Sequence, residues 1–125
     1  MLIEGEEFTN ENSPFQQLTE DVYRYCTFSS FSAEGPHIQA ALLDCRFSHL
    51  DLYWAFFNCA VIVDCKFEDC VFRGASFRGC KVVDSEFLRC RFIKDNLGGS
   101  CVSSDTHWYG CTATDCEGWD ALMAQ

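Results

Sequence analysis

The chain has 125 residues, of which 48% are hydrophobic, and a formal net charge of −10 at pH 7. This length suits one domain with one core, and the hydrophobic share excludes a wholly disordered chain. Residues 1–7 are acidic and lack the basic start and apolar run of a signal peptide. No stretch reaches the ~20 apolar residues of a membrane span. We therefore expect a soluble, cytoplasmic protein without membrane contact.

In the first 39 residues, the apolar side chains recur in steps of five or multiples of five. The large positions are Ile3, Phe8, Leu18, Tyr23, Phe28 and Ile38, with Ser13 and Ala33 as weak members. Neither the 3.6-residue stripe of a helix nor the two-residue alternation of a strand gives this period. One residue is missing from the frame near Gly35-Pro36.

From Ala40 to Leu97 the five-residue period is continuous. Each group begins with a small residue, usually Cys, Ala or Ser, and has a large apolar residue third. The third residues are Leu42, Phe47, Leu52, Phe57, Ile62, Phe67, Phe72, Phe77, Val82, Phe87, Phe92 and Leu97. Two groups depart from the small first residue: Leu50 is large, and Asp95 carries a carboxylate. Because an unpaired buried carboxylate is costly, we expect a distorted corner that leaves Asp95 in water. The repeat predicts that the first and third residues of each group face inward.

Beyond Leu97 one residue is inserted near Gly98-Gly99. The small positions then continue as Cys101, Thr106, Cys111 and Cys116. The last residues, about 117–125, contain Trp119-Asp-Ala-Leu-Met and are expected to form a short capping helix.

The ten cysteines suggest disulfides or a zinc site at first sight. The closest pairs, Cys65/Cys70 and Cys111/Cys116, lie five residues apart, wider than a structural zinc motif, and the three histidines do not cluster with them. Nine of the ten cysteines instead occupy the small slot, Cys59 being the exception. We interpret them as buried spacers with free thiols and expect no metal and no cofactor.

This repeat resembles the A/C/S-(D/N)-(L/F)-x-x pattern of the pentapeptide-repeat family over residues 1–118. The resemblance implies an all-β fold, a right-handed β-solenoid (a quadrilateral β-helix) in which four repeats make one square coil. About six coils are expected, at residues 1–19, 20–39, 40–59, 60–79, 80–100 and 101–120. Together with the cap they would form a single domain over residues 1–125.

Coils of about twenty residues stack equivalent side chains above one another, which predicts three interior columns. The first is Phe8, Phe28, Phe47, Phe67, Phe87 and Trp108; the second is Leu18, Ile38, Phe57, Phe77 and Leu97; the third is Leu52, Phe72 and Phe92. Each buried Phe would contribute about 2–3 kcal/mol by transfer from water.

One outward face carries an apolar stripe where polar residues are expected. Its members are Val22, Ala41, Leu43, Val61, Val63, Val83 and Val102. A stripe of this length points to a covered surface. Two explanations are open: a terminal segment such as the one around Trp119 covers it, or it forms a side-by-side homodimer interface.

Tyr53, Trp54 and Phe56 are also predicted to face outward, on the third coil. Clustered aromatic residues often anchor a protein interface. They could equally pack under the Gly35-Pro36 loop or a neighbouring edge. A stacking platform for nucleic acid would need a basic surround.

Four aspartates, one per coil, are expected along a single corner. They are Asp44, Asp64, Asp84 and Asp105. Aspartate favours such turns for structural reasons. A calcium site and a row that imitates DNA phosphates are the two functional alternatives.

Catalysis is not expected from this sequence. His37, His49 and His107 fall on separate corners, without a nucleophile beside them, and no phosphate-binding loop or metal motif is present. We therefore predict no enzyme and no catalytic residue.

The family resemblance implies a role in DNA mimicry, in which acidic rods bind bacterial type II topoisomerases such as gyrase in place of DNA. The charge of this chain is unevenly placed, because residues 40–100 hold eight acidic and eight basic side chains and the acidic excess lies at both ends. This profile favours a protein-interaction or scaffold module that binds an unknown protein through its outer faces, without direct nucleic-acid contact. The alternative is an acidic mimic that modulates or protects a topoisomerase.

Overall fold

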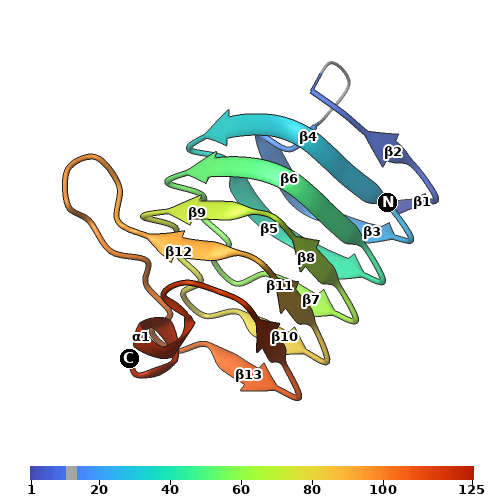
Figure 1. Ribbon diagram of the computed structural model, residues 1–125. Coiled ribbons are helices and arrows are strands. Elements are labelled where there is room, and N and C mark those ends of the chain that lie inside the picture. The colour runs from blue at the N-terminus through green and yellow to red at the C-terminus, as the bar shows by residue number, and fades with distance from the viewer. Residues whose placement is uncertain (11–13) are drawn as a thin grey trace.

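The computed structural model describes residues 1–10 and 14–125, and it is a β-solenoid built almost entirely of parallel strands (Figure 1). The weak repeat position Ser13 lies outside the described residues. One sheet, called face A here, contains six strands in the order β1-β3-β5-β7-β10-β13. Their bounds are β1 (Leu2–Glu4), β3 (Gln17–Arg24), β5 (His37–Leu43), β7 (Val61–Val63), β10 (Lys81–Val83) and β13 (His107–Tyr109).

The other strands form the next two faces of the coil, faces B and C. They are β2 (Glu7–Phe8), β4 (Thr27–Glu34), β6 (Arg46–Tyr53), β8 (Lys66–Glu68), β9 (Val71–Arg73), β11 (Glu86–Leu88), β12 (Arg91–Ile93) and β14 (Thr112–Thr114). The long strands β4 and β6 bend from face B to face C, since β6 pairs with β8 in its first part and with β9 in its second.

Face D closes the square. It consists of the first residues of β3 and β5, followed by single bridges that join His37 to Phe56, Phe56 to Ser76, and Ser76 to Val102. Residues 20–104 therefore make four coils with a strand or bridge on every side. A first level, which includes β1 and β2, and a last level, which includes β13 and β14, flank them, so the six expected coils appear as six levels on face A.

The corners explain why the period is five. Three strand residues are followed by a corner residue with positive φ and then by a small inward residue. Asp44, Asp64 and Asp84 have φ values of 51°, 53° and 49°. Aspartate tolerates this left-handed conformation better than most residues because its short side chain can hydrogen-bond to the local backbone.

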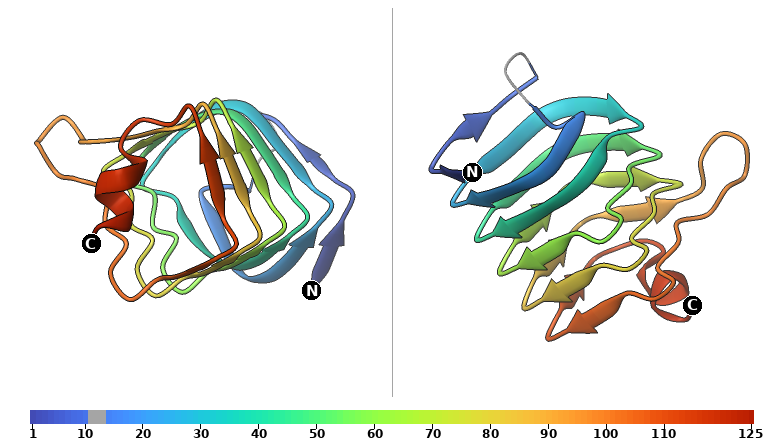
Figure 2. Two further views of the ribbon diagram at one scale, coloured as in Figure 1. Left: turned by 60° about the horizontal axis from the view of Figure 1, so that its bottom comes forward. Right: turned by 180° about the vertical axis from the view of Figure 1, so that it is seen from behind.

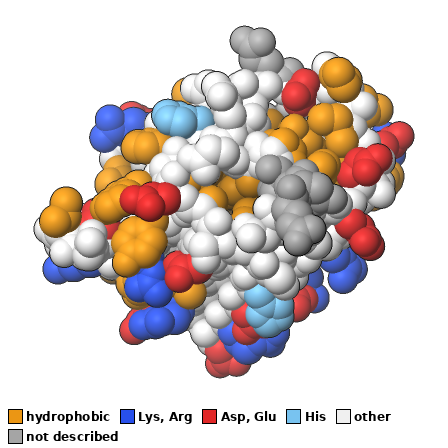
Figure 3. Space-filling model, turned by 90° about the horizontal axis from the view of Figure 1, so that it is seen from above, with side chains coloured by type: hydrophobic (Ala, Val, Ile, Leu, Met, Phe, Trp, Pro, Cys, Tyr) orange, Lys and Arg blue, Asp and Glu red, His pale blue; other side chains and the backbone are white. Residues whose placement is uncertain are grey.

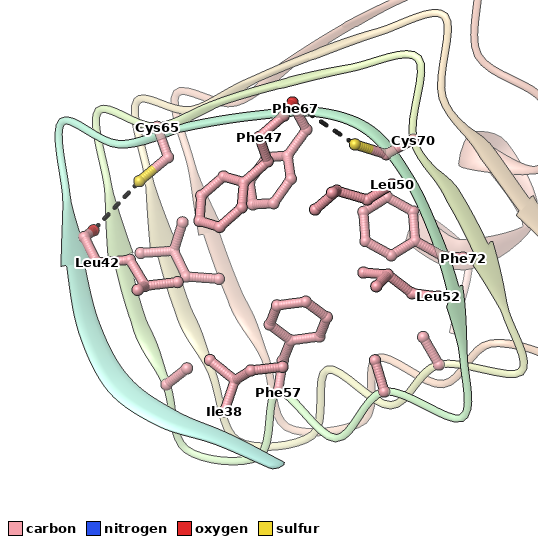
Figure 4. Packing of buried hydrophobic residues seen from close by; sticks show 14 of the residues in the cluster. Ile38, Leu42, Phe47, Leu50, Leu52, Phe57, Cys65, Phe67, Cys70 and Phe72 are labelled. Atoms are coloured by element: carbon pink, nitrogen blue, oxygen red, sulfur yellow. Dashed lines mark hydrogen bonds between the residues drawn. The ribbon is translucent and has the colours of Figure 1, made fainter. Parts of the chain in front are cut away.

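The interior consists of stacked rings, as the repeat predicts (Figure 4). Phe47 and Phe67 lie 4.4 Å apart between ring centroids at an interplanar angle of 7°, and Phe67 and Phe87 lie 4.8 Å apart at 5°. Phe57 and Phe77 form a second stack at 4.9 Å, and Phe72 and Phe92 form a third, also at 4.9 Å.

Thiols fill the small slots and also satisfy the backbone. Cys65 donates to the carbonyl oxygen of Leu42 at 3.2 Å, and Cys70 donates to that of Phe47 at 3.5 Å (Figure 4). All ten cysteines are free, and seven are buried. Cysteine therefore suits these slots by its size and by its ability to donate to the coil above.

Phe15 is a core residue that the five-residue frame does not predict. Its side chain is 1% exposed, and its ring packs edge-on against Phe28, Phe31 and Phe47. It therefore fills the interior near the N-terminal end from outside the repeat positions.

The repeat frame is wrong after Ile93. A loop over residues 94–100 projects from the rod between faces C and D (Figure 1). This coil is therefore six residues longer than the coil before it, because Lys81 pairs with His107, whereas Val61 pairs with Lys81. The predicted boundary at residue 100 is wrong, because Val102 completes face D of this coil. The five-residue period treats residues 95–97 as a repeat, although they belong to this loop.

This shift also corrects two of the predicted columns. Trp108 pairs with Val82, and Ala113 takes the place below Phe87 that was expected for Trp108. Leu97, expected in the core, lies on the loop and is 85% exposed. The third column is confirmed, since Leu52 pairs with Phe72 and Phe72 with Phe92.

The expected cap is present as helix α1 (Trp119–Met123), which closes the C-terminal end of the rod (Figure 2). The Trp119 ring lies 5.2 Å from that of Phe87, 5.7 Å from Phe92 and 5.5 Å from Trp108. Leu122 is 2% exposed. The opposite end, seen in Figure 3, shows hydrophobic side chains between polar ones and many charged side chains around its rim. No helix in the described part of the chain has the length and hydropathy to span a membrane.

Candidate interaction surface

Face A brings most of the predicted stripe together. In each strand the middle residue points inward, and the first and third residues point outward, because side chains alternate along a strand. The inward residues of the central levels, Tyr23, Leu42, Ile62 and Val82, are at most 2% exposed. The outward residues of the same levels are Val22, Arg24, Ala41, Leu43, Val61, Val63, Lys81 and Val83.

Six of the seven residues predicted for this stripe therefore share one surface, namely Val22, Ala41, Leu43, Val61, Val63 and Val83. Val102 does not belong to it, because the long loop moves this residue to face D, where it bridges to Ser76. The apolar surface continues at both ends, through Leu2 and Tyr109, which are 53% and 57% exposed.

The terminal segment around Trp119, one of the two explanations left open for the stripe, lies elsewhere. Helix α1 packs on the end of the rod, against the rings of Phe87, Phe92 and Trp108. Its contacts with the strands are to β12, at the far side from face A (Figure 2). In residues 1–10 and 14–125, no terminal segment packs on the central strands β5, β7 and β10. Val61 accordingly remains 38% exposed.

Charged residues lie at the edges of face A. Arg24 is 3.8 Å from Glu4 and donates to the Tyr25 hydroxyl at 3.0 Å, and its guanidinium lies over the Tyr25 ring. The N-terminal ammonium is 3.6 Å from Asp21. Lys81 is exposed at the other end, without an ion pair among the described residues.

The aspartate row contains three members instead of four. Asp44, Asp64 and Asp84 occupy successive corners between faces A and B. Asp105 lies at another corner, between faces D and A, because Gly110 takes the position after Tyr109 that follows Asp84 in the row. The long loop again causes the difference.

A groove of about 380 Å³ follows this row of corners. It is lined by Tyr25, Asp44, Cys45, Arg46, Asp64, Cys65, Lys66, Asp84 and Glu86. Arg46 and Lys66 stand beside the carboxylates, so the groove carries charges of both signs. No group of three His, Cys, Asp or Glu side chains in the described part of the chain is arranged to hold a metal ion.

The three predicted aromatic residues separate into two contacts. The rings of Tyr53 and Trp54 lie 5.2 Å apart, and Arg73 lies over the Tyr53 ring while it pairs with Asp51 at 2.9 Å. Phe56 stacks on His37 at 5.1 Å, on face D. These rings are therefore in contact with each other or with side chains of the adjacent coils, His37 and Arg73.

Trp54 also holds the projecting loop, through Asp95. The sequence predicted that Asp95 lies in water at a distorted corner. Asp95 accepts hydrogen bonds from the Trp54 indole N–H and from the backbone N–H groups of Leu97 and Gly99, each at 2.8 Å. These bonds lower the pKa of the Asp95 carboxyl, with the Gly99 backbone contact contributing most. In place of the expected distorted corner there is thus an ordered loop, in which both carboxylate oxygens of Asp95 accept hydrogen bonds.

The ionisable groups of the interior are thiols and the phenol of Tyr23. Desolvation raises the pKa of the Cys80 thiol to about 12. Cys59, the cysteine outside the repeat slot, is exposed at the corner between faces D and A. The three histidines stay apart, with His37 on face D, His49 at a corner after face B, and His107 on face A.

Comparison with known proteins gives matches among solved structures alone, since no family model and no curated protein matches the chain. The fold is defined by its four-sided coils, in which the first and third residues of the five-residue repeats point inward. The chain is a four-sided β-solenoid built on a five-residue repeat.

Among similar structures is a trypsin-treated variant of QnrB1, a plasmid-mediated fluoroquinolone resistance protein, at 17% identity and a TM-score of 0.42. That match covers 92% of this chain and 66% of QnrB1, so the chain spans slightly less than two thirds of it. The pentapeptide-repeat protein Rfr23 from the cyanobacterium Cyanothece is 11% identical, with 93% and 83% covered and a TM-score of 0.31. HetL from the cyanobacterium Nostoc, involved in heterocyst differentiation regulation, is 11% identical, with 94% and 84% covered and a TM-score of 0.29.

Proposed function

We propose that this pentapeptide-repeat chain is a non-enzymatic interaction module that binds another protein through face A. The observation that carries the proposal is the apolar, uncovered surface of Val22, Leu43, Val61, Val63 and Val83 on adjacent strands. Burial of an exposed valine or leucine side chain contributes about 1.5–3 kcal/mol. Several such residues on one flat sheet provide the apolar centre of a protein interface.

Faces B and C differ from face A because their outward charges already pair with one another. Lys66 lies 3.0 Å from Glu68, Arg89 lies 2.8 Å from Asp69, and Arg91 lies 2.8 Å from Glu117. Such exposed pairs are well solvated and gain little from a partner. Burial of face A therefore gives a larger gain than burial of face B or face C.

The test compares two valine substitutions in the same coil. Val61→Glu puts a charge in the middle of face A, whereas Val71→Glu puts one on the outward side of β9, on face C. We expect a tagged Val61→Glu protein to lose partners that the wild type and Val71→Glu both retain in affinity purification. Equal partner sets for all three proteins would contradict the proposal.

A second candidate function rests on Asp44, Asp64 and Asp84, which recur once per coil along one corner. Such a row could imitate DNA phosphates toward a topoisomerase, although Arg46 and Lys66 line the same groove. A gyrase supercoiling assay with wild type and Asp64→Asn tests this candidate. Inhibition, or protection from a quinolone, that weakens in Asp64→Asn would support mimicry, and an unchanged reaction with wild type would exclude it.

A further inference from the structure

We infer that the partner of face A is a second copy of this chain, packed face to face with both rods pointing in the same direction. This inference rests on the proposed use of face A as a docking surface and names its occupant. It follows from the flatness of the face and from the charges along its two edges.

The outward residues of face A form a surface that a copy of itself can cover. Its central levels carry Ala41, Leu43, Val61 and Val63, which are all aliphatic side chains without a ring. Two sheets pack face to face at about 10 Å, a separation that such side chains fill. Six strands at about 4.8 Å spacing make a face roughly 25 Å long, so the contact falls at the small end of stable interfaces. We expect a reversible dimer with a dissociation constant in the micromolar range.

A two-fold axis can relate two such faces in two ways. With the axis along the rod, the rods are parallel, and the first residue of each strand lies opposite the third residue of the same strand in the second copy. With the axis along the strands, the rods are antiparallel, and the third level lies opposite the fourth. Both arrangements bury the valines, so charge decides between them.

In the parallel arrangement, each charged edge of face A meets an opposite charge. Lys81 lies opposite Val83 of the second copy, beside its Asp84. Arg24 lies opposite Val22 of the second copy, beside its Asp21, which already attracts the N-terminal ammonium. Both pairs occur twice because the axis is two-fold. In the antiparallel arrangement the second level lies opposite the fifth, so Arg24 again lies beside Asp84 of the second copy and Lys81 beside its Asp21. These pairs therefore favour a second copy as the partner, and the aspartate row is what distinguishes the two orientations.

The antiparallel arrangement places the aspartate row against itself. Asp44, at the third level, would lie opposite Asp64 of the second copy, at the fourth, and the same contact would repeat across the axis. Like charges brought together at an interface are unfavourable. The parallel arrangement instead places Asp64 opposite the corner of the second copy that carries Cys59.

Sedimentation velocity over micromolar to submillimolar concentrations tests the dimer. We expect wild type and Val71→Glu to sediment as a monomer–dimer equilibrium, and Val61→Glu to weaken the dimer about tenfold or more because it buries an unpaired charge. Circular dichroism checks that both variants remain folded. A wild type that stays monomeric throughout overturns the second copy as partner, whereas the affinity purification described above can still succeed.

Cross-linking tests the orientation, because Cys59 is exposed and the other cysteines are buried or half-buried. With a short bismaleimide, Asp64→Cys should cross-link as a dimer, since residue 64 meets Cys59 of the second copy in parallel rods. Asp64→Cys in a Cys59→Ser background should lose this product. Efficient cross-linking of wild type through Cys59 alone would indicate antiparallel rods and overturn the assigned orientation.

Discussion

The coils of residues 40–79 and the part from residue 80 to the C-terminus use the same repeat but are held together differently. In the first region, equivalent rings stack nearly parallel, as do Phe57 and Phe77, 4.9 Å apart at 10°. In the second, Phe87 and Phe92 still stack on the preceding coil, but beyond them the stacks end, and the rings of Trp108 and Trp119 meet at 77°. Repetition therefore stabilises the middle of the rod, whereas particular contacts of a loop and a helix stabilise its C-terminal end.

The largest effect should come from removal of a stacked ring in the regular region. Phe67→Ala should lower the free energy of unfolding by about 3–5 kcal/mol, since Phe67 is 1% exposed and packs between two other rings. Urea denaturation measures this loss. Trp108→Ala is the matched change at the end, and its loss should be smaller because Trp108 is half-exposed. Equal losses would contradict the comparison.

Loss of the cap should act mainly on the last coil. Trp119→Ala removes ring contacts with Phe87, Phe92 and Trp108, and we expect a loss of about 2–3 kcal/mol, because Trp119 is only partly buried. Hydrogen exchange should accelerate in β13 and β14 and stay unchanged in β7 and β8. Uniform acceleration along the rod would mean that the end and the middle unfold as one unit.

Alkaline pH should weaken the regular region through its buried thiols. Because the pKa of Cys80 is raised to about 12 from 9.0, its stabilising effect is complete below pH 9 and is lost as the pH rises from 9 toward 12. The urea midpoint should therefore fall between pH 9 and pH 10, and less steeply in Cys80→Ala. Cys59→Ala, which changes an exposed cysteine, should keep the wild-type slope.

The smallest effect should come from the projecting loop. Asp95→Ala removes the acceptor for Trp54, Leu97 and Gly99 and should speed hydrogen exchange and proteolysis within residues 94–100, with less loss of stability than any of the three ring substitutions. Because the pKa of Asp95 is lowered, its contribution is present above the ordinary carboxyl pKa and disappears as the pH falls below it. Exchange of the Gly99 amide at pH 3 and pH 7 measures this change.

Much of the fold could be predicted because the repeat is local. A small residue and a large apolar residue two positions later are enough to predict which side chains face inward, and Phe47, Phe67 and Phe72 lie where the period places them. The stripe of Val22, Leu43, Val61, Val63 and Val83 follows from the same rule. Val102 and Asp105 were misplaced because the loop over residues 94–100 imitates a further repeat, and nothing in the period indicates that it leaves the coil.

By itself, the sequence determined the coil, its interior and the apolar face, since these depend on side-chain size and spacing within a few residues. Only the tertiary structure decided where the chain returns after the loop, because that register depends on which strand His107–Tyr109 joins and on the hydrogen bonds that Asp95 accepts. The tertiary structure also decided that helix α1 closes the end of the rod and leaves face A open. The reason is that the Trp119 ring packs against Phe87, Phe92 and Trp108 at the end of the rod and not against the stripe.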